Sequence, residues 1–196
     1  VSTVKSYETM SYNDTYFRLQ DIALVRDFES VHEFSTGKNV TVALVDTGLD
    51  RQHPEIAGRV SFARNYVDYD QARFDSDEHG TAVAGVIASA ANNAVGIVGV
   101  APDVELKVFK ACAQGNNGRA TCDSVSLMKA LIDVINHQPD ILNLSLSGPE
   151  DDLIRRLLVR AYTDGIVLVA AVDPRRVEAS FPASMPEVIS VGTSLM

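Results

Sequence analysis

The chain has 196 residues, 46% hydrophobic and 22% charged, which supports one sizeable core and is short for two ordinary domains. Its formal net charge of -9 opposes binding to nucleic acid or anionic lipid. Arg155, Arg156 and Arg160 follow acidic residues on one predicted helix, which favours a solvated face over a binding patch. The longest apolar run, 166–172, is far shorter than the ~18 residues of a membrane helix. We therefore expect neither a nucleic-acid nor a membrane partner.

The hydrophobic pattern predicts the elements in chain order. Residues 1–19 are polar and aperiodic and predict a surface arm, which a short helix over 20–34 follows, so that 1–37 form an N-terminal arm and helix. Strands are then predicted over 40–45, 104–110, 141–146, 166–172 and 188–192. Helices are predicted from about 80 to 91, over 123–137, and from about 150 to 163. The strands are nearly continuous in Val, Ile and Leu, which indicates an α/β fold: a three-layer, mostly parallel β-sheet with helices on both faces.

The two cysteines, Cys112 and Cys122, flank the flexible segment AQGNNGRAT, which can fold back and bring their sulfurs together. A disulfide and a free thiol pair are both open, whereas two thiols without a nearby histidine make a poor zinc site. A disulfide would imply an oxidising compartment, so we expect a secreted or periplasmic protein. The start at Val1, without a charged and then apolar leader, predicts a processed or cut N-terminus.

Polar residues that follow strands are the candidates for chemistry, because ligands of such sheets bind outside the carboxyl ends of the strands. Asp46, Ser145, Asp173 and Ser194 have such positions. An Asp-Thr-Gly sequence at 46–48 also occurs in aspartic proteases, but these need two such carboxylates and a mostly β fold. The single copy and the predicted helices argue against that class.

His79 directly precedes a helix whose first turns are nearly all small residues. Alone it could be a surface histidine, or a metal ligand together with Asp75, Asp77 and Glu78, although no HExxH or spaced His pair supports zinc. In combination with Asp46 it predicts a catalytic pair. The carboxylate would orient one ring nitrogen and leave the other to act as a general base.

Long motifs around these two residues resemble the subtilase family of serine proteases, over residues from about 38 to 194. VTVALVDTGLDRQHPEI is similar to the family's aspartate motif, and HGTAVAGVIASAANNAVGIVGVAP to its histidine motif. The resemblance implies that residues 38–196 are a catalytic core, that Asp46 orients His79, and that Ser145, Leu146 and Ser147 form one wall of the substrate cleft. The family usually has glycine where Ser147 stands, which implies a narrower first specificity pocket or a local shift.

The nucleophilic serine is predicted to lie outside this chain. Gly-Thr-Ser at 192–194 is similar to the family's serine motif, but it ends a predicted strand and only two residues follow, so Ser194 is rejected as the nucleophile. The core is therefore expected to be incomplete at its C-terminus. By the same resemblance, Asp173 occupies the position of an asparagine of the oxyanion hole. An ionised carboxylate offers no donor there, so either Asp173 is protonated, or another group acts and Asp173 is a turn residue before proline.

The resemblance also implies a structural calcium site. Its ligands would be Glu55, the Asn93 side chain and the carbonyls of Ala91, Val95 and Ile97, all hard oxygen donors, with an ordinary Asn-rich turn as the alternative. No cofactor is expected for catalysis itself.

We therefore expect a serine endopeptidase that hydrolyses polypeptide substrates by Asp-His-Ser acyl transfer, although residues 1–196 alone would be inactive. The partner expected besides the substrate is the missing C-terminal part of the catalytic domain, without which apolar strand faces would be exposed. The alternative is a catalytically inactive pseudoprotease that binds extended peptides.

Overall fold

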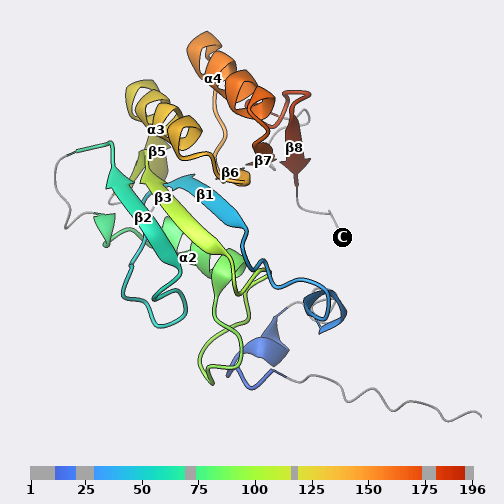
Figure 1. Cartoon of the computed structure of the whole chain (residues 1–196). Helices are drawn as coiled ribbons and strands as arrows, with labels where there is room; N and C mark the ends of the chain where they lie inside the picture. The colour runs from blue at the N-terminus through green and yellow to red at the C-terminus, as the bar shows by residue number, and fades with distance from the viewer. Residues whose placement is uncertain (1–11, 21–28, 69–73, 116–118, 174–179, 193–196) are drawn as a thin grey trace, which may run out of the picture.

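A six-stranded parallel sheet, in the order β2-β3-β1-β6-β7-β8, forms the centre of the computed structural model (Figure 1). The structure describes residues 12–20, 29–68, 74–115, 119–173 and 180–192. The strands of this sheet are β1 (Thr41–Asp46), β2 (Val60–Asn65), β3 (Glu105–Lys110), β6 (Ile141–Leu144), β7 (Val167–Ala171) and β8 (Val188–Val191). Because all neighbouring pairs are parallel, their carboxyl ends lie along one edge, as expected for a sheet whose ligands bind at that edge.

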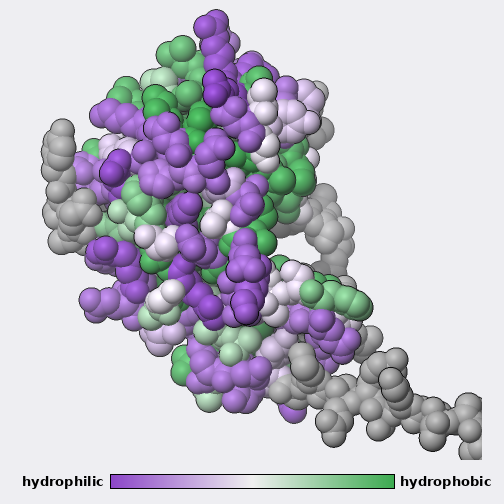
Figure 2. Space-filling view, in the orientation of Figure 1, coloured by the Kyte–Doolittle hydropathy of each residue, from purple (hydrophilic) through white to green (hydrophobic). Residues whose placement is uncertain are grey.

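Helices cover both faces of the sheet, which confirms the predicted three-layer α/β fold. Helices α3 (Ser124–His137) and α4 (Asp152–Thr163) pack on one face and α2 (Glu78–Ala88) on the other. The buried residues of α3 follow a helical period, with Leu127, Leu131 and Val134 on the inner side. Figure 2 shows hydrophilic side chains over much of the visible surface. Among the described residues, no helix is long and apolar enough to cross a bilayer.

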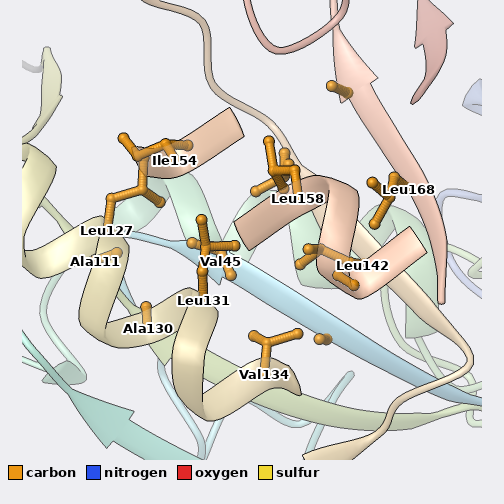
Figure 3. Packing of buried hydrophobic residues seen from close by; sticks show 14 of the residues in the cluster. Val45, Ala111, Leu127, Ala130, Leu131, Val134, Leu142, Ile154, Leu158 and Leu168 are labelled. Carbon is orange, nitrogen blue, oxygen red and sulfur yellow. The ribbon is translucent and has the colours of Figure 1, made fainter. Parts of the chain in front are cut away.

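Strand β1 lies at the boundary of two hydrophobic clusters and is buried on both faces. Its alternate residues Ala43 and Val45 pack toward α3 and α4, in the cluster of Figure 3, whereas Val42 and Leu44 pack toward α2. The end of β1 is therefore held from both sides. A polar residue at that end has little freedom to move.

Several elements differ from the sequence-based expectations. Strand β2 was not predicted, because VSFARN is only half-buried and mixes polar with apolar residues at the edge of the sheet. The antiparallel pair β4 (Cys112–Gln114) and β5 (Ala120–Cys122) was also missed, since these strands have only three residues each. Most of the predicted helix over 20–34 lies outside the described residues. Tyr12 and Phe17 are buried, with Phe17 in the short 3-10 helix η1 (Phe17–Leu19), so the N-terminal segment is anchored to the domain.

One face of the sheet is left partly uncovered at the β7–β8 end. Leu168 faces the helical cluster, so its neighbour Val167 points to the opposite face and is 43% exposed. On β8, Ile189 and Val191 are 57% and 52% exposed. Hydrophobic residues reach the surface beside β8 in Figure 2. On α2, which packs on that same opposite face, Val86 is 57% exposed.

Candidate active site

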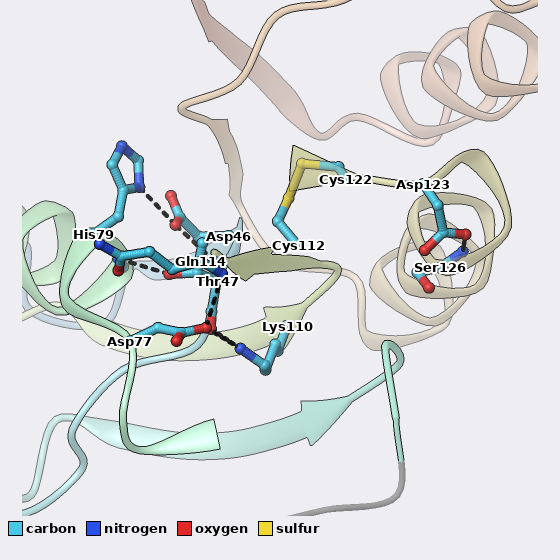
Figure 4. The surroundings of a disulfide bond; sticks show 11 residues. Asp46, Thr47, Asp77, His79, Lys110, Cys112, Gln114, Cys122, Asp123 and Ser126 are labelled. Carbon is cyan, nitrogen blue, oxygen red and sulfur yellow. Dashed lines mark hydrogen bonds and ion pairs between the residues drawn. A yellow bond between two sulfur atoms is a disulfide. The ribbon is translucent and has the colours of Figure 1, made fainter. Parts of the chain in front are cut away.

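Asp46 and His79 form a hydrogen-bonded pair at the carboxyl edge of the sheet (Figure 4). Asp46 is the last residue of β1, its side chain is 3% exposed, and its Oδ1 lies 2.7 Å from His79 Nδ1. The backbone N–H of Thr47 donates to the same oxygen at 2.7 Å. Because a carboxylate can only accept, Nδ1 is the nitrogen that carries the proton. The other ring nitrogen points away from Asp46 and is free to accept a proton from a reacting group.

Two glycines allow α2 to start this close to the end of β1. The backbone N–H of Gly80 donates to Thr47 Oγ1 at 3.1 Å. A Cβ atom at position 80 would lie 1.8 Å from the carbonyl oxygen of Gly48, and Gly48 itself has a φ of +91°. Only glycine fits at position 80 without moving the helix, and His79 is the residue beside it.

Gln114 and Lys110, which no sequence motif marked, tie the start of α2 to β4 and β3. Gln114 accepts the backbone N–H of Glu78 at 2.9 Å and Thr47 Oγ1 accepts that of Gly80 at 3.1 Å, whereas the Asp77 side chain caps none of the first N–H groups. Asp77 instead forms an ion pair with Lys110, whose Nζ also donates to the carbonyl of Thr47. The sequence does place Lys110 at the end of a predicted buried strand. A buried charge needs a partner, so this lysine could have pointed to an ion pair here.

The alternative of a metal held by His79 with its acidic neighbours is wrong. Asp75 pairs with Arg51, through bonds of 2.9 and 3.0 Å, and Asp77 pairs with Lys110. Within the described ranges, no group of three or more His, Cys, Asp or Glu residues could hold a metal ion.

A cleft of about 690 Å³ lies beside the pair and contains the predicted substrate wall. Asp46 and His79 line it together with residues 145–147, which continue from β6 in the strand adjacent to β1. Strand β5 also lines it, and all three of its residues are exposed. Cys112 and Cys122 form a disulfide that joins β4 to β5 at this cleft. The sequence allows this disulfide but gives no sign that β5 belongs to the cleft.

Two carboxylates at the cleft also cap helices. The pKa of Asp123 is lowered, chiefly by a hydrogen bond from the Ser126 side chain, and its Oδ1 accepts the backbone N–H of Val125 and Ser126 at the start of α3. The pKa of Asp151 is lowered mainly by the backbone N–H of Ile154 at the start of α4. Both groups therefore stay anionic at neutral pH.

Two other residues selected from the sequence, Asp173 and Ser194, are not among the described residues that line the cleft beside Asp46 and His79. Asp173 is half-buried two residues beyond the end of β7, on the edge that also carries Asp46, but it does not line the cleft. Its predicted place in the oxyanion hole stays a prediction. Ser194 lies outside the described residues.

Glu55, one of the residues predicted to bind calcium, is a buried carboxylate beside the loop that holds the other predicted ligands. Glu55 is 4% exposed, and neither of its side-chain oxygens has a hydrogen-bond partner. The loop over 91–97 approaches it so closely that a Cβ atom at Gly96 would lie 2.4 Å from Glu55 Oε1. Asp14, also buried, accepts the backbone N–H of Asn92 at 2.9 Å in the same loop. An unpaired buried carboxylate is costly, so these oxygens fit a hard cation.

Comparison with known proteins identifies relatives over most of the chain. Residues 37–195 match the model of the subtilase family. The chain is 34% identical to the major intracellular serine protease of Bacillus subtilis (strain 168), over 80% of this chain and 51% of that protein. The chain is also 34% identical to subtilisin E of the same organism, over 80% of this chain and 41% of the relative. A thermophilic serine proteinase of Bacillus sp. (strain AK1) is 32% identical, over 92% of this chain and 45% of that protein. The chain thus spans about half the length of these relatives, or less.

Proposed function

Because the chain belongs to the subtilase family, we propose that it is part of a serine endopeptidase, in which Asp46 and His79 serve a nucleophilic serine located outside residues 1–196. The 2.7 Å bond between the buried Asp46 carboxylate and His79 Nδ1 is the observation that carries this proposal. It gives the imidazole a fixed tautomer and aims the free nitrogen away from the carboxylate.

In the proposed reaction, His79 takes the proton of the serine hydroxyl while the serine oxygen attacks the carbonyl carbon of the peptide bond. The protonated His79 ring, stabilised by Asp46, then gives that proton to the departing amine. Water, activated by the same nitrogen, attacks the acyl-enzyme and releases the serine. Asp46 stays ionised throughout, because its role is to orient and stabilise the imidazolium.

Residues Ser145, Leu146 and Ser147 are proposed to bind the substrate backbone in an extended conformation. They continue from β6 and line the cleft next to Asp46, where an added strand can exchange backbone hydrogen bonds with them. The exposed strand β5 lies in the lining of the same cleft and offers a second backbone edge. The disulfide fixes β5 to β4 and so limits its movement.

The uncovered apolar face is proposed to contact the part of the catalytic domain that carries the serine. Val86, Val167, Ile189 and Val191 are each more than 40% exposed in the described residues. Exposed apolar surface of this kind is typical of a site that another polypeptide segment covers. We therefore expect residues 1–196 to aggregate when isolated, or to require that partner.

Asp173 is proposed to lie near the oxyanion position, as a protonated donor if it acts in catalysis. Calcium is proposed to bind between Glu55 and the loop over 91–97, with Asn93 and the carbonyls of Ala91, Val95 and Ile97 as further ligands and with Asp14 close to that loop. A bound cation there would neutralise the buried carboxylates and stabilise the folded domain.

An oxidising location, secreted or periplasmic, is proposed because a disulfide persists in such compartments. One relative is named as an intracellular protease. The oxidation state of Cys112 and Cys122 in protein isolated under thiol-trapping conditions therefore separates the two locations.

A serine-directed fluorophosphonate tests the proposed activity. Residues 1–196 alone should not be labelled, whereas the complete protein should be labelled and should lose labelling when His79→Ala removes the base. Labelling of Ser194 in the short chain would contradict the proposal. A complete protein that binds extended peptides but is never labelled would instead be the pseudoprotease.

A further inference from the structure

Lys110 is a buried charge that the proposed acyl transfer does not use. It is the last residue of β3, is 1% exposed, and lies in direct register with Asp46 on β1. Burying an ammonium group is costly unless it is paired and hydrogen-bonded, and a buried ion pair is by itself weak evidence for stability. The location of its partners suggests another reason for this charge.

The two partners of Lys110 belong to the two segments that carry the catalytic pair. Its Nζ donates to the carbonyl of Thr47, the residue after Asp46, and to the carboxylate of Asp77, two residues before His79 (Figure 4). One ammonium group therefore connects the end of β1 to the start of α2. The Asp46–His79 hydrogen bond spans the same two segments.

The surrounding contacts leave Asp77 available for this role. An aspartate directly before a helix ordinarily accepts the first backbone N–H groups of that helix. Here the Asp77 side chain makes no such cap: the N–H of Gly80 donates to Thr47 Oγ1 at 3.1 Å, and the N–H of Glu78 donates to Gln114 at 2.9 Å. The Asp77 carboxylate thus binds Lys110 and, at 3.3 Å, the backbone N–H of Gln114. The start of α2 is held to β3 and β4 rather than only by its own cap.

We propose that Lys110 is a positioning residue that sets the Asp46–His79 geometry through Thr47 and Asp77. This inference rests on the proposed function for its catalytic meaning, but the hydrogen bond that it concerns can be observed without any hydrolysis. Removing the bridge should let the start of α2 move relative to β1. The Nδ1–H proton of His79 should then exchange faster with water.

The test measures that proton by NMR in the complete protein, with Lys110→Met/Asp77→Asn as the principal variant. Both charges are removed together, so no unpaired charge is left buried. We expect a folded variant whose His79 Nδ1–H signal exchanges with water at least about tenfold faster, equivalent to about 1.4 kcal/mol. The matched control is Lys107→Met, since Lys107 lies on the same strand but donates to the His137 carbonyl at 3.2 Å. It should leave the signal unchanged.

A second variant and a kinetic measurement keep the proposal testable if the double variant does not fold. Asp77→Asn alone keeps an oxygen that can accept from Lys110, and it should accelerate exchange in the same direction by a smaller factor. In a complete, active enzyme, the double variant should lower kcat by about 10²-fold, the scale of a 1 Å misplacement, with little change in KM. The positioning role would be overturned if the His79 Nδ1 proton exchanged with water at the wild-type rate in the folded double variant or in folded Asp77→Asn. Failure of the complete enzyme to hydrolyse peptides would contradict the proposed function but leave the exchange result standing.

Discussion

Replacing Gly80 by alanine should separate the two catalytic residues. The new Cβ would lie 1.8 Å from the carbonyl oxygen of Gly48, whereas real Cβ contacts essentially never fall below 3.0 Å, so the backbone must open by at least about 1.2 Å. The clash is with backbone, which cannot rotate away as a side chain can. Because His79 is the preceding residue, much of this movement is expected to reach its ring.

The expected size of the effect follows from that displacement. The His79–Asp46 distance is 2.7 Å, and an opening of about 1.2 Å in the same direction would take it beyond the ~3.2 Å limit of a good hydrogen bond. Overpacking of this kind costs about 1–3 kcal/mol of unfolding free energy. For a chain of this size each kcal/mol lowers Tm by roughly 2–4 °C. In a complete enzyme, kcat/KM should fall by about 10²-fold.

Gly85→Ala is the matched control, because it makes the same substitution in the same helix. A Cβ at position 85 would meet only the hydroxyl of Ser89, at 3.5 Å, which is an ordinary contact. Alanine is favoured over glycine inside a helix by about 0.5–1 kcal/mol, so this variant should melt at a higher temperature than wild type and keep its activity. Thermal unfolding followed by circular dichroism measures both variants. Equal or higher Tm for Gly80→Ala would refute the packing argument.

Three further predictions concern the disulfide, calcium and the oxyanion hole. Under denaturing, non-reducing conditions neither cysteine should be alkylated, and a mass gain of two alkyl groups would exclude the Cys112–Cys122 bridge. In a complete domain, calcium at 100 times its Kd should add about 2.7 kcal/mol of stability, seen as a higher Tm that chelator reverses. Glu55→Gln should lose this response and exposed Glu33→Gln should keep it, whereas a chelator-insensitive Tm in wild type would remove the site. Asp173→Asn supplies a permanent donor, so kcat in the complete enzyme should rise by up to about 10²- to 10³-fold if Asp173 lines the oxyanion hole. An unchanged rate across pH would assign Asp173 to the turn alone.

Much of the fold follows from the local pattern of the chain. The strands β1, β3, β6, β7 and β8 are rich in Val, Ile and Leu with few polar interruptions outside β3, and such segments bury well in a parallel sheet with helices on both faces. The elements that were missed are short or lie at an edge, where burial is low and the pattern weak. β5 is exposed along its whole length, so no hydrophobic period marks it.

The same distinction applies to the site. Asp46 and His79 could be selected from the sequence, because each lies at the end or start of an element and within a long motif. That Asp46 orients His79 was also expected, but their 2.7 Å separation depends on how closely α2 approaches β1, which the Gly48–Gly80 contact decides. Lys110 is a similar case, because the sequence shows only that a lysine lies at the end of a buried strand. Only the tertiary structure joins its ammonium group to Thr47 and Asp77, because partners 63 and 33 residues away meet through packing that local sequence does not encode.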